Sequence, residues 1–192
     1  MPESRVPLTA QSLRGIAHPL RVRLLNLLRE DGPSTATRLA ERTGESSGAT
    51  SYHLRQLARY GFAEENPGQP GGRERWWRAT SRSTSLEGPT LRSSPAEAET
   101  YLQAVASEYA DRVDRWLSGV TALPDEWDEG ATLSNWRLRL TAAESTQLLA
   151  ELEGVIDRYR RDTGESTKDS QAERVVLQVQ LMPFLDRPEV TA

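Results

Sequence analysis

The segment from Ser34 to Gly61 constrains the fold of this chain most, because it holds two short helical stretches with a sharp turn between them. Thr43-Gly44 marks the turn, since glycine adopts positive φ readily and often follows the last residue of a helix. Ser46 stands where a side-chain cap is needed, and apolar residues then recur every three or four positions. We therefore predict a first helix that ends at the turn and a second helix over residues 47–59.

Helices are also predicted on the N-terminal side of this segment. Thr9 is placed to cap a helix over residues 10–17, which Pro19 interrupts because the residue before a proline avoids the helical region. Pro19 can itself stand in the first turn of the next helix, which runs to Glu30. Ser34 or Thr35 then caps the helix that leads into the turn.

A basic hairpin is predicted directly after the second helix. Residues 62–65 and 73–79 read as two strands, and the residues 66–72 between them include three glycines and two prolines, which exclude regular structure there. Trp76 and Trp77 must point to opposite faces of their strand. One should pack on the core, and the other should cover an adjoining helix or a partner subunit. Helix, turn, helix and hairpin in this order predict a winged helix-turn-helix domain.

The second half of the chain is expected to be a separate acidic region. We predict a domain at residues 1–82, a polar linker at 83–94 and a dimerisation or regulatory region at 95–192. The sequence Ser94-Pro95-Ala96-Glu97 is typical of a helix start, and that helix should run to about residue 118. Its apolar residues form one seam, namely Leu102, Val105, Tyr109, Val113, Trp116 and Val120. The seam suits a dimer interface and suits equally well packing within the subunit, onto the strand pair predicted next.

The last part is predicted to be strand, helix and strand over residues 133–182. Residues 135–140 and 174–181 alternate apolar and polar side chains, as half-buried strands do. Thr141 and Glu144 have the spacing of a capping box that opens a helix. We expect the two strands to pair, in either orientation. The fold class is therefore α+β: a winged helix-turn-helix domain, a long helix and a small strand–helix–strand unit.

Charge and composition narrow the class of partner. Residues 1–82 carry 13 Arg against 8 Asp and Glu, whereas residues 83–192 carry 11 Lys and Arg against 20 Asp and Glu. A basic half suits contact with phosphate, and the acidic half does not. No cysteine is present and the two histidines are isolated, so we predict no metal site. The acidic run at residues 125–129 is interpreted as a solvated loop rather than a site for a hard cation. We find no membrane span or signal peptide and expect a soluble, cytoplasmic protein.

The second helix has the side chains that a helix in the DNA major groove needs. Small polar residues near its N-terminus let the backbone approach the groove floor, an arginine can grip a guanine edge or a phosphate, and the helix N-terminus attracts phosphate. Two arginines beside the glycine-rich loop can hold the DNA backbone or enter a minor groove. The candidate DNA-binding residues are Ser46, Ser47, Gly48, Thr50, Ser51, Tyr52, His53, Arg55, Arg73 and Arg75.

Five motifs together resemble the winged-helix regulators of the arsenic-repressor-like (ArsR) group. They cover residues within 10–80 and lie at 17–28, 37–40, 49–57, 61–62 and 72–78. The resemblance implies a homodimeric transcription regulator that binds an inverted repeat in double-stranded DNA, with one recognition helix in each half-site. Metal sensing is not carried over, because members that sense metals use cysteine pairs or histidine–carboxylate clusters. The chain is also about twice as long as the minimal members.

Two function classes remain open on the sequence alone. The first is a DNA-binding transcription regulator, with a repressor favoured over an activator. The second is a winged-helix module that binds protein and not DNA, which acidic residues near the proposed interface support: Glu45, Glu64, Glu65 and Glu74. An enzyme is not expected, since no cysteine nucleophile, phosphate loop or paired-histidine motif is present. No cofactor is predicted. An unidentified small-molecule effector stays among the candidate partners, with no residues assigned to it.

Overall fold

A computed structural model describes residues 5–67, 74–159 and 172–184 of the chain. The chain divides into two compact units, Met1–Thr121 and Ala122–Ala192. Among the described residues, no helix is both long and apolar enough to cross a membrane.

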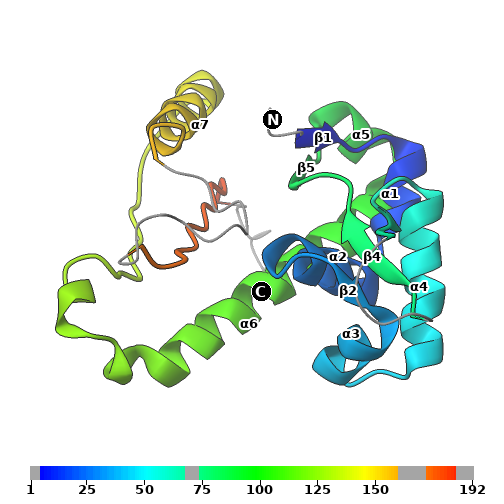
Figure 1. Cartoon of the computed structure of the whole chain (residues 1–192). Helices are drawn as coiled ribbons and strands as arrows, with labels where there is room; N and C mark the ends of the chain where they lie inside the picture. The colour runs from blue at the N-terminus through cyan, green and yellow to red at the C-terminus, as the bar shows by residue number, and fades with distance from the viewer. Residues whose placement is uncertain (1–4, 68–73, 160–171, 185–192) are drawn as a thin grey trace, which may run out of the picture. The chain divides into compact units, whose positions relative to one another are not determined.

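The first unit contains the predicted winged helix, and its helices have the predicted order (Figure 1). The helices are α1 (Ala10–Ile16), α2 (Pro19–Glu30), α3 (Ala36–Thr43) and α4 (Ser47–Arg59). The predicted α+β winged-helix fold is therefore confirmed for this part of the chain.

Local capping explains why these helices begin and end where they do. The hydroxyls of Thr9, Thr35 and Ser46 accept the N–H groups of Ser12, Arg38 and Ala49, which would otherwise lack partners in the first helical turn. Thr35, and not Ser34, is thus the cap of α3. Gly44 ends α3 with a φ of 75°, a conformation that residues with a β-carbon rarely adopt. The turn between α3 and α4 is therefore set by local chemistry.

The wing is a three-stranded antiparallel sheet with the order β2-β4-β3. Its strands are β2 (Ser34–Thr35), β3 (Ala63–Glu65) and β4 (Trp76–Ala79). As predicted, the two tryptophans take opposite faces: Trp77 is buried in the core, while the guanidinium of Arg38 on α3 lies 4.9 Å from the Trp76 ring centre. The second tryptophan is therefore covered by the adjoining helix of the same chain.

One hydrophobic core joins these elements. Its fully buried side chains come from all four helices of the winged helix and include Leu13, Ile16, Leu24, Leu25, Leu39, Leu54 and Leu57. Burying a leucine or isoleucine side chain is worth roughly 1.5–3 kcal/mol relative to leaving it exposed. The core thus fixes the positions of α3 and α4 relative to each other and to the wing.

Residues 83–94 are not the linker that the sequence suggested. They form β5 (Ser83–Ser85), which pairs in parallel with β1 (Arg5–Pro7), and α5 (Gly88–Ser93). The pairing continues through Leu8, whose N–H donates to Ser85 O at 2.8 Å and whose carbonyl accepts the Thr90 hydroxyl at 2.8 Å. Partners about 80 residues away in sequence stabilise this polar stretch, and a local pattern does not reveal them.

Helix α6 (Pro95–Gly119) packs on α1 and α2 and so belongs to the first unit. The residues that it buries are Ala98, Tyr101 and Ala104, with Val105 beside them. The contact includes Val105 of the apolar seam and is made with helices rather than with a strand pair, while Leu102 of the seam is exposed. Ser94 precedes α6, but its side chain makes no capping hydrogen bond.

The second unit contains the predicted helix but not the predicted strands. Helix α7 (Ala142–Ile156) begins at the Thr141–Glu144 capping box, and a short 3₁₀ turn precedes it at Asp125–Trp127; another, at Val120–Ala122, spans the boundary between the units. Residues 135–140 and 174–181 form no strand in the structure, so the expected strand pair was wrong. Alternation alone does not make a strand, since a strand needs a hydrogen-bonded neighbour and a covered face.

Candidate nucleic-acid interface

Helix α4 presents one face to the core and another to solvent. Thr50, Leu54 and Leu57 are fully buried, which anchors the helix against the rest of the winged helix. The first turn carries no bulky side chain on its open side. Five predicted DNA-binding residues are exposed here, namely Ser46, Ser47, Gly48, Tyr52 and Arg55, and Ser51 is half-buried beside them. The helix therefore offers a small, polar N-terminal surface.

Thr50 was wrongly included among the groove-facing residues. Its side chain is 0% exposed, and its hydroxyl lies on the core side of α4 with no hydrogen-bond partner. The residue stands four positions before Leu54, so both lie on the same buried face of the helix. DNA cannot reach Thr50 unless α4 leaves the core.

His53 also turns away from the open face. Its ring lies against that of His18, with 4.4 Å between the ring centroids and a tilt of 36°. His18 Nδ1 accepts the Leu20 N–H at 3.2 Å and so caps α2. Burial lowers the pKa of both imidazoles, and the charge of Arg21 lowers it further. Both rings are therefore neutral at pH 7, and they form part of the joint between α2 and α4.

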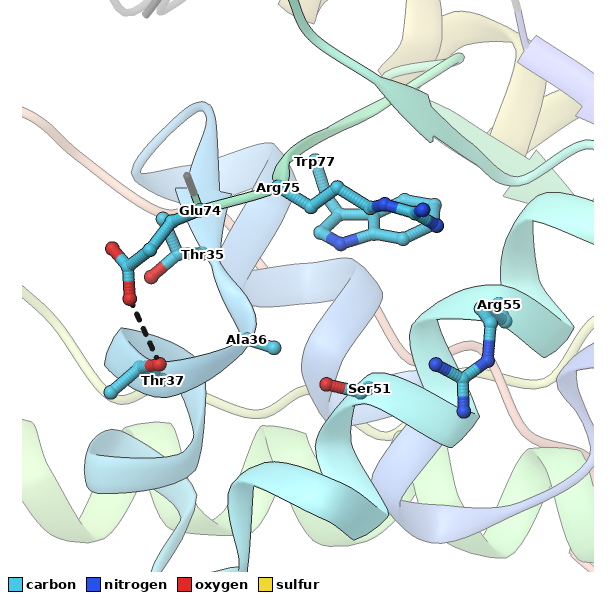
Figure 2. Close-up of a pocket in the computed structure, with 8 residues that line it drawn as sticks. All are labelled: Thr35, Ala36, Thr37, Ser51, Arg55, Glu74, Arg75 and Trp77. Carbon is cyan, nitrogen blue, oxygen red and sulfur yellow. Dashed lines mark hydrogen bonds between the residues drawn. The ribbon is translucent and has the colours of Figure 1, made fainter. Parts of the chain in front are cut away.

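An open pocket of about 330 Å³ lies where α3, α4 and the wing meet. Figure 2 shows that its side chains come from these three elements and surround one opening. The lining residues are Thr35, Ala36, Thr37, Ser51, Arg55, Glu74, Arg75 and Trp77. The pocket thus brings together three of the predicted site residues, Ser51, Arg55 and Arg75, from two elements that are far apart in sequence.

Ion pairs within the wing reduce its positive charge. Arg75 lies 3.1 Å from a Glu65 oxygen, and Arg78 lies 2.7 Å from a Glu64 oxygen. All four side chains are about half exposed or more, so water screens both pairs. Arg73, the other predicted arginine of the wing, lies outside the described residues.

Five lining residues are absent from the predicted site, and two of them, Thr37 and Glu74, are joined by a hydrogen bond. Thr37 stands in the first turn of α3, and its hydroxyl donates to a Glu74 carboxylate oxygen at 3.1 Å. Glu74 was noted only as an acidic residue near the interface. The useful signal was the cap at Thr35, which places the next hydroxyl, Thr37, at the exposed N-terminal end of α3. Its pairing with a residue 37 positions later has no local signature.

No group of three or more histidine, cysteine or acidic residues that could hold a metal ion occurs in the described part of the chain. The acidic run at residues 125–129 begins with a 3₁₀ turn, and four of its five residues are exposed.

Comparisons with known proteins point to the same segment. Residues 16–66 match a family model described as "Helix-turn-helix domain". No curated protein matches the chain. Similar solved structures include a mutant of Lactococcus lactis ZitR in apo form, with a TM-score of 0.32, 17% identity, and coverage of 71% of this chain and 81% of that chain.

Two further structures have comparable scores. Transcriptional regulator Tm0710 from Thermotoga maritima has a TM-score of 0.33, 14% identity, and coverage of 76% of this chain and 79% of that chain. Transcriptional regulator PA4135 has a TM-score of 0.32, 16% identity, and coverage of 76% and 88%. These TM-scores are low, so the helix-turn-helix assignment rests on the family match and on the geometry of α3, α4 and the turn between them. Residues 16–66 therefore contain a helix-turn-helix domain with α3 and α4 as its two helices.

Proposed function

We propose that this chain is a transcription regulator that binds double-stranded DNA through its winged helix. The observation that carries the proposal is the two-sided surface of α4, with Thr50, Leu54 and Leu57 in the core and a polar N-terminal face open to solvent. A helix of this kind, set at a fixed angle by the core, can enter the major groove without disturbing the fold.

The small residues of α4 allow its first turn to approach the bases. Ser47, Gly48 and Ser51 have small side chains or none, and the two serine hydroxyls can donate to a base edge or a phosphate. Arg55 lies one turn further along and has no hydrogen bond or ion pair with any described residue. Its guanidinium is therefore available to bind guanine or a phosphate as a two-pronged donor.

The wing supplies backbone contacts in this proposal. Arg75 lines the pocket next to α4, so its guanidinium can reach a phosphate of the strand that borders the major groove. Arg73 is assigned the same role from its position beside the glycine-rich loop. Phosphate contacts of this kind set the register of the protein on the duplex and make binding dependent on salt.

We further propose a homodimer of the ArsR-like type that acts as a repressor on an inverted repeat. Helix α6 leaves Leu102 and Leu117 nearly half exposed, at 46% and 48%. Each lies outside the stripe that α6 buries against α1 and α2, so both are open to a second copy. Residues 1–82 would thus bind DNA, and residues 95–192 would supply dimerisation and regulation, including any small-molecule effector.

A protein-binding module is the second candidate, and the wing ion pairs favour it. Glu64 and Glu65 pair with Arg78 and Arg75, and with Glu74 the described part of the wing has three Glu against two Arg, a net charge of -1. A surface of balanced charge suits a protein partner better than a phosphate backbone.

Fluorescence anisotropy with a labelled duplex separates the two candidates. The chain should bind at low salt and lose affinity steeply as salt rises, because each neutralised phosphate releases counterions. Duplexes selected from genomic fragments would then define the specific site. Absence of binding at the lowest salt would exclude the DNA-binding proposal and leave the protein-binding module.

Arg55→Ala tests the role of α4 on the selected site. A base contact predicts a loss of about 1–3 kcal/mol in binding free energy and a weaker preference at one base position. Arg115→Ala is the matched control, since it removes the same charge from an exposed position on α6. Equal losses in the two variants would show that Arg55 contributes only net charge.

A further inference from the structure

We infer that Glu74 limits the affinity of this protein for DNA, because its carboxylate lies at the edge of the pocket in which a backbone phosphate would bind. The inference rests on the proposed function and adds a residue that works against it. Glu74 would lower affinity for every duplex by the same factor, whatever the base sequence, because the group it competes with is the phosphate.

The position of Glu74 follows from one hydrogen bond. Thr37 Oγ1 donates to Glu74 Oε1 at 3.1 Å, and Figure 2 shows this bond at the edge of the pocket. Thr37 lies in the first turn of α3, where free N–H groups and the helix dipole favour a negative charge. An anion of the protein itself thus lies at the end of α3, on the surface that faces the proposed DNA.

The rest of the pocket is suited to a phosphate. Arg55 and Arg75 line it from α4 and from the wing, and the Ser51 hydroxyl lies between α3 and Arg55 in the close-up (Figure 2). The guanidinium groups of Arg55 and of Arg75, which also pairs with the exposed Glu65, match donors that hold phosphate in protein–DNA complexes, as do hydroxyls such as that of Ser51. Glu74 is the one acidic residue among the lining residues.

The carboxylate has two effects on a phosphate that enters this pocket. It accepts the hydrogen bond from Thr37 that a phosphate oxygen could otherwise accept, and its negative charge repels a phosphate in the same partly screened pocket. Replacing Glu74 by Gln keeps an oxygen that can accept from Thr37 and removes only the charge. We therefore expect roughly tenfold tighter binding at low salt, because the interaction between two unit charges in one pocket changes affinity by about a factor of ten or more.

The test compares three variants on a random-sequence duplex of about 20 base pairs by fluorescence anisotropy at several salt concentrations. Glu74→Gln should bind roughly tenfold more tightly than the parent at low salt, with a salt slope steeper by about 0.9, the value for one more neutralised phosphate. Glu74→Asp, which keeps the charge, should stay close to the parent. Glu64→Gln makes the same change in net charge outside the pocket, on a residue that pairs with Arg78, and should gain much less.

Each result decides the inference. Tighter binding in Glu74→Gln alone supports it. Equal gains in Glu74→Gln and Glu64→Gln would assign the effect to net charge and overturn it, and so would a Glu74→Asp variant that binds as tightly as Glu74→Gln. If the parent binds the duplex and Glu74→Gln is unchanged, the inference fails while the proposed function stands. If neither binds at the lowest salt, both fail. Matching far-UV circular dichroism spectra would show that all the variants are folded.

Discussion

The two units of this chain differ in whether their apolar residues are buried against one another. In the first unit, leucines from α1 to α4 are fully buried together with Trp77. In the second unit, α7 buries no residue, and Trp136 and Leu177 are 79% and 67% exposed. Both units contain segments with amphipathic sequence patterns, but only in the first unit are the apolar residues of these segments buried in a core.

A local sequence pattern can specify a single helix, whereas a hydrophobic core requires several helices or strands whose apolar faces pack together. The described part of the second unit has one helix longer than a turn, and the segments on each side of it form neither a long helix nor a strand. Cores below about 70–80 residues rarely provide enough stability alone. Three pairs of substitutions, one member in each unit, should therefore have unequal effects, and a fourth change, of pH, should act on the first unit.

The largest contrast is expected for truncation of a leucine. Leu54→Ala should lower the free energy of unfolding by about 2–5 kcal/mol, because Leu54 is fully buried and its removal leaves a cavity. Leu138→Ala, at a position that is 57% exposed, should change it by less than about 0.5 kcal/mol. Urea unfolding followed by tryptophan fluorescence measures both. A large loss for Leu138→Ala would mean that the second unit has a core after all.

A second contrast comes from two helical glycines. A β-carbon on Gly15 of α1 would lie 2.2 Å from Tyr60 Cγ, so the helix and the ring must move apart in Gly15→Ala. Overpacking of this kind costs about 1–3 kcal/mol. Gly154 of α7 has no such neighbour within 4 Å, so Gly154→Ala should stabilise its helix by up to about 1 kcal/mol through helix propensity.

Thermal unfolding by circular dichroism should therefore move in opposite directions for the two alanines. A Gly15→Ala variant as stable as the parent would show that the contact between α1 and Tyr60 is loose, and would weaken the view that α4 is held rigidly.

Features that depend on residues close in sequence were predicted correctly, whereas features that depend on distant partners were not. The bounds of α4 and the turn at Gly44 were predicted from single side chains, because capping and positive φ depend on residues close in sequence. The pairing of β1 with β5 was missed, because it joins residues about 80 positions apart and neither strand is apolar. The strands expected at 135–140 and 174–181 have a correct period but no neighbour.

The candidate site shows the same limits. The exposed residues of α4 were predictable, since a helix with Leu54 and Leu57 inside must have its opposite side outside. Thr50 was placed on the wrong face, because threonine is polar and the helix period alone left it at the border. The contact between Thr37 and Glu74 joins two elements, and only the folded sheet brings them together.

A smaller contrast is expected when the caps of the two units are removed. Ser46→Ala and Thr141→Ala each lose a side chain that accepts an N–H group in the first helical turn, which costs about 1 kcal/mol. In the first unit the loss should appear as a lower midpoint of cooperative unfolding, because α4 is part of the core. In the second it should appear as reduced helix content with an unchanged midpoint. Equal shifts of the midpoint would show that α7 unfolds together with the first unit.

The smallest change in stability is expected when the pH is lowered through the range in which histidine titrates. It should affect the first unit alone, because both histidines of the chain lie there. Burial, Arg21 and, for His53, the neighbouring imidazole hold the pKa values of His18 and His53 below 6.5, and Glu45 opposes this shift. A pKa that is lower in the folded state means that the unfolded chain takes up protons first as pH falls. Stability should therefore be unaffected above about pH 6.5, fall below it, and level off once the folded-state pKa values are passed.

Protonation of His18 has a further local consequence, because Nδ1 would then carry a proton and could no longer accept the Leu20 N–H. A cation at the N-terminus of α2 is also disfavoured by the helix dipole. The double variant His18→Asn with His53→Gln keeps a capping oxygen and removes both titrating groups. Urea unfolding at pH 7.5 and 5.5 should show a smaller acid loss in this variant than in the parent. Burial raises the pKa of Glu108. Because this residue is present in both the parent and the variant, its contribution to the change in stability with pH is the same in the two. Identical losses would mean that carboxylates, present in both units, cause the whole effect, and the two histidines would then be only a packing contact between α2 and α4.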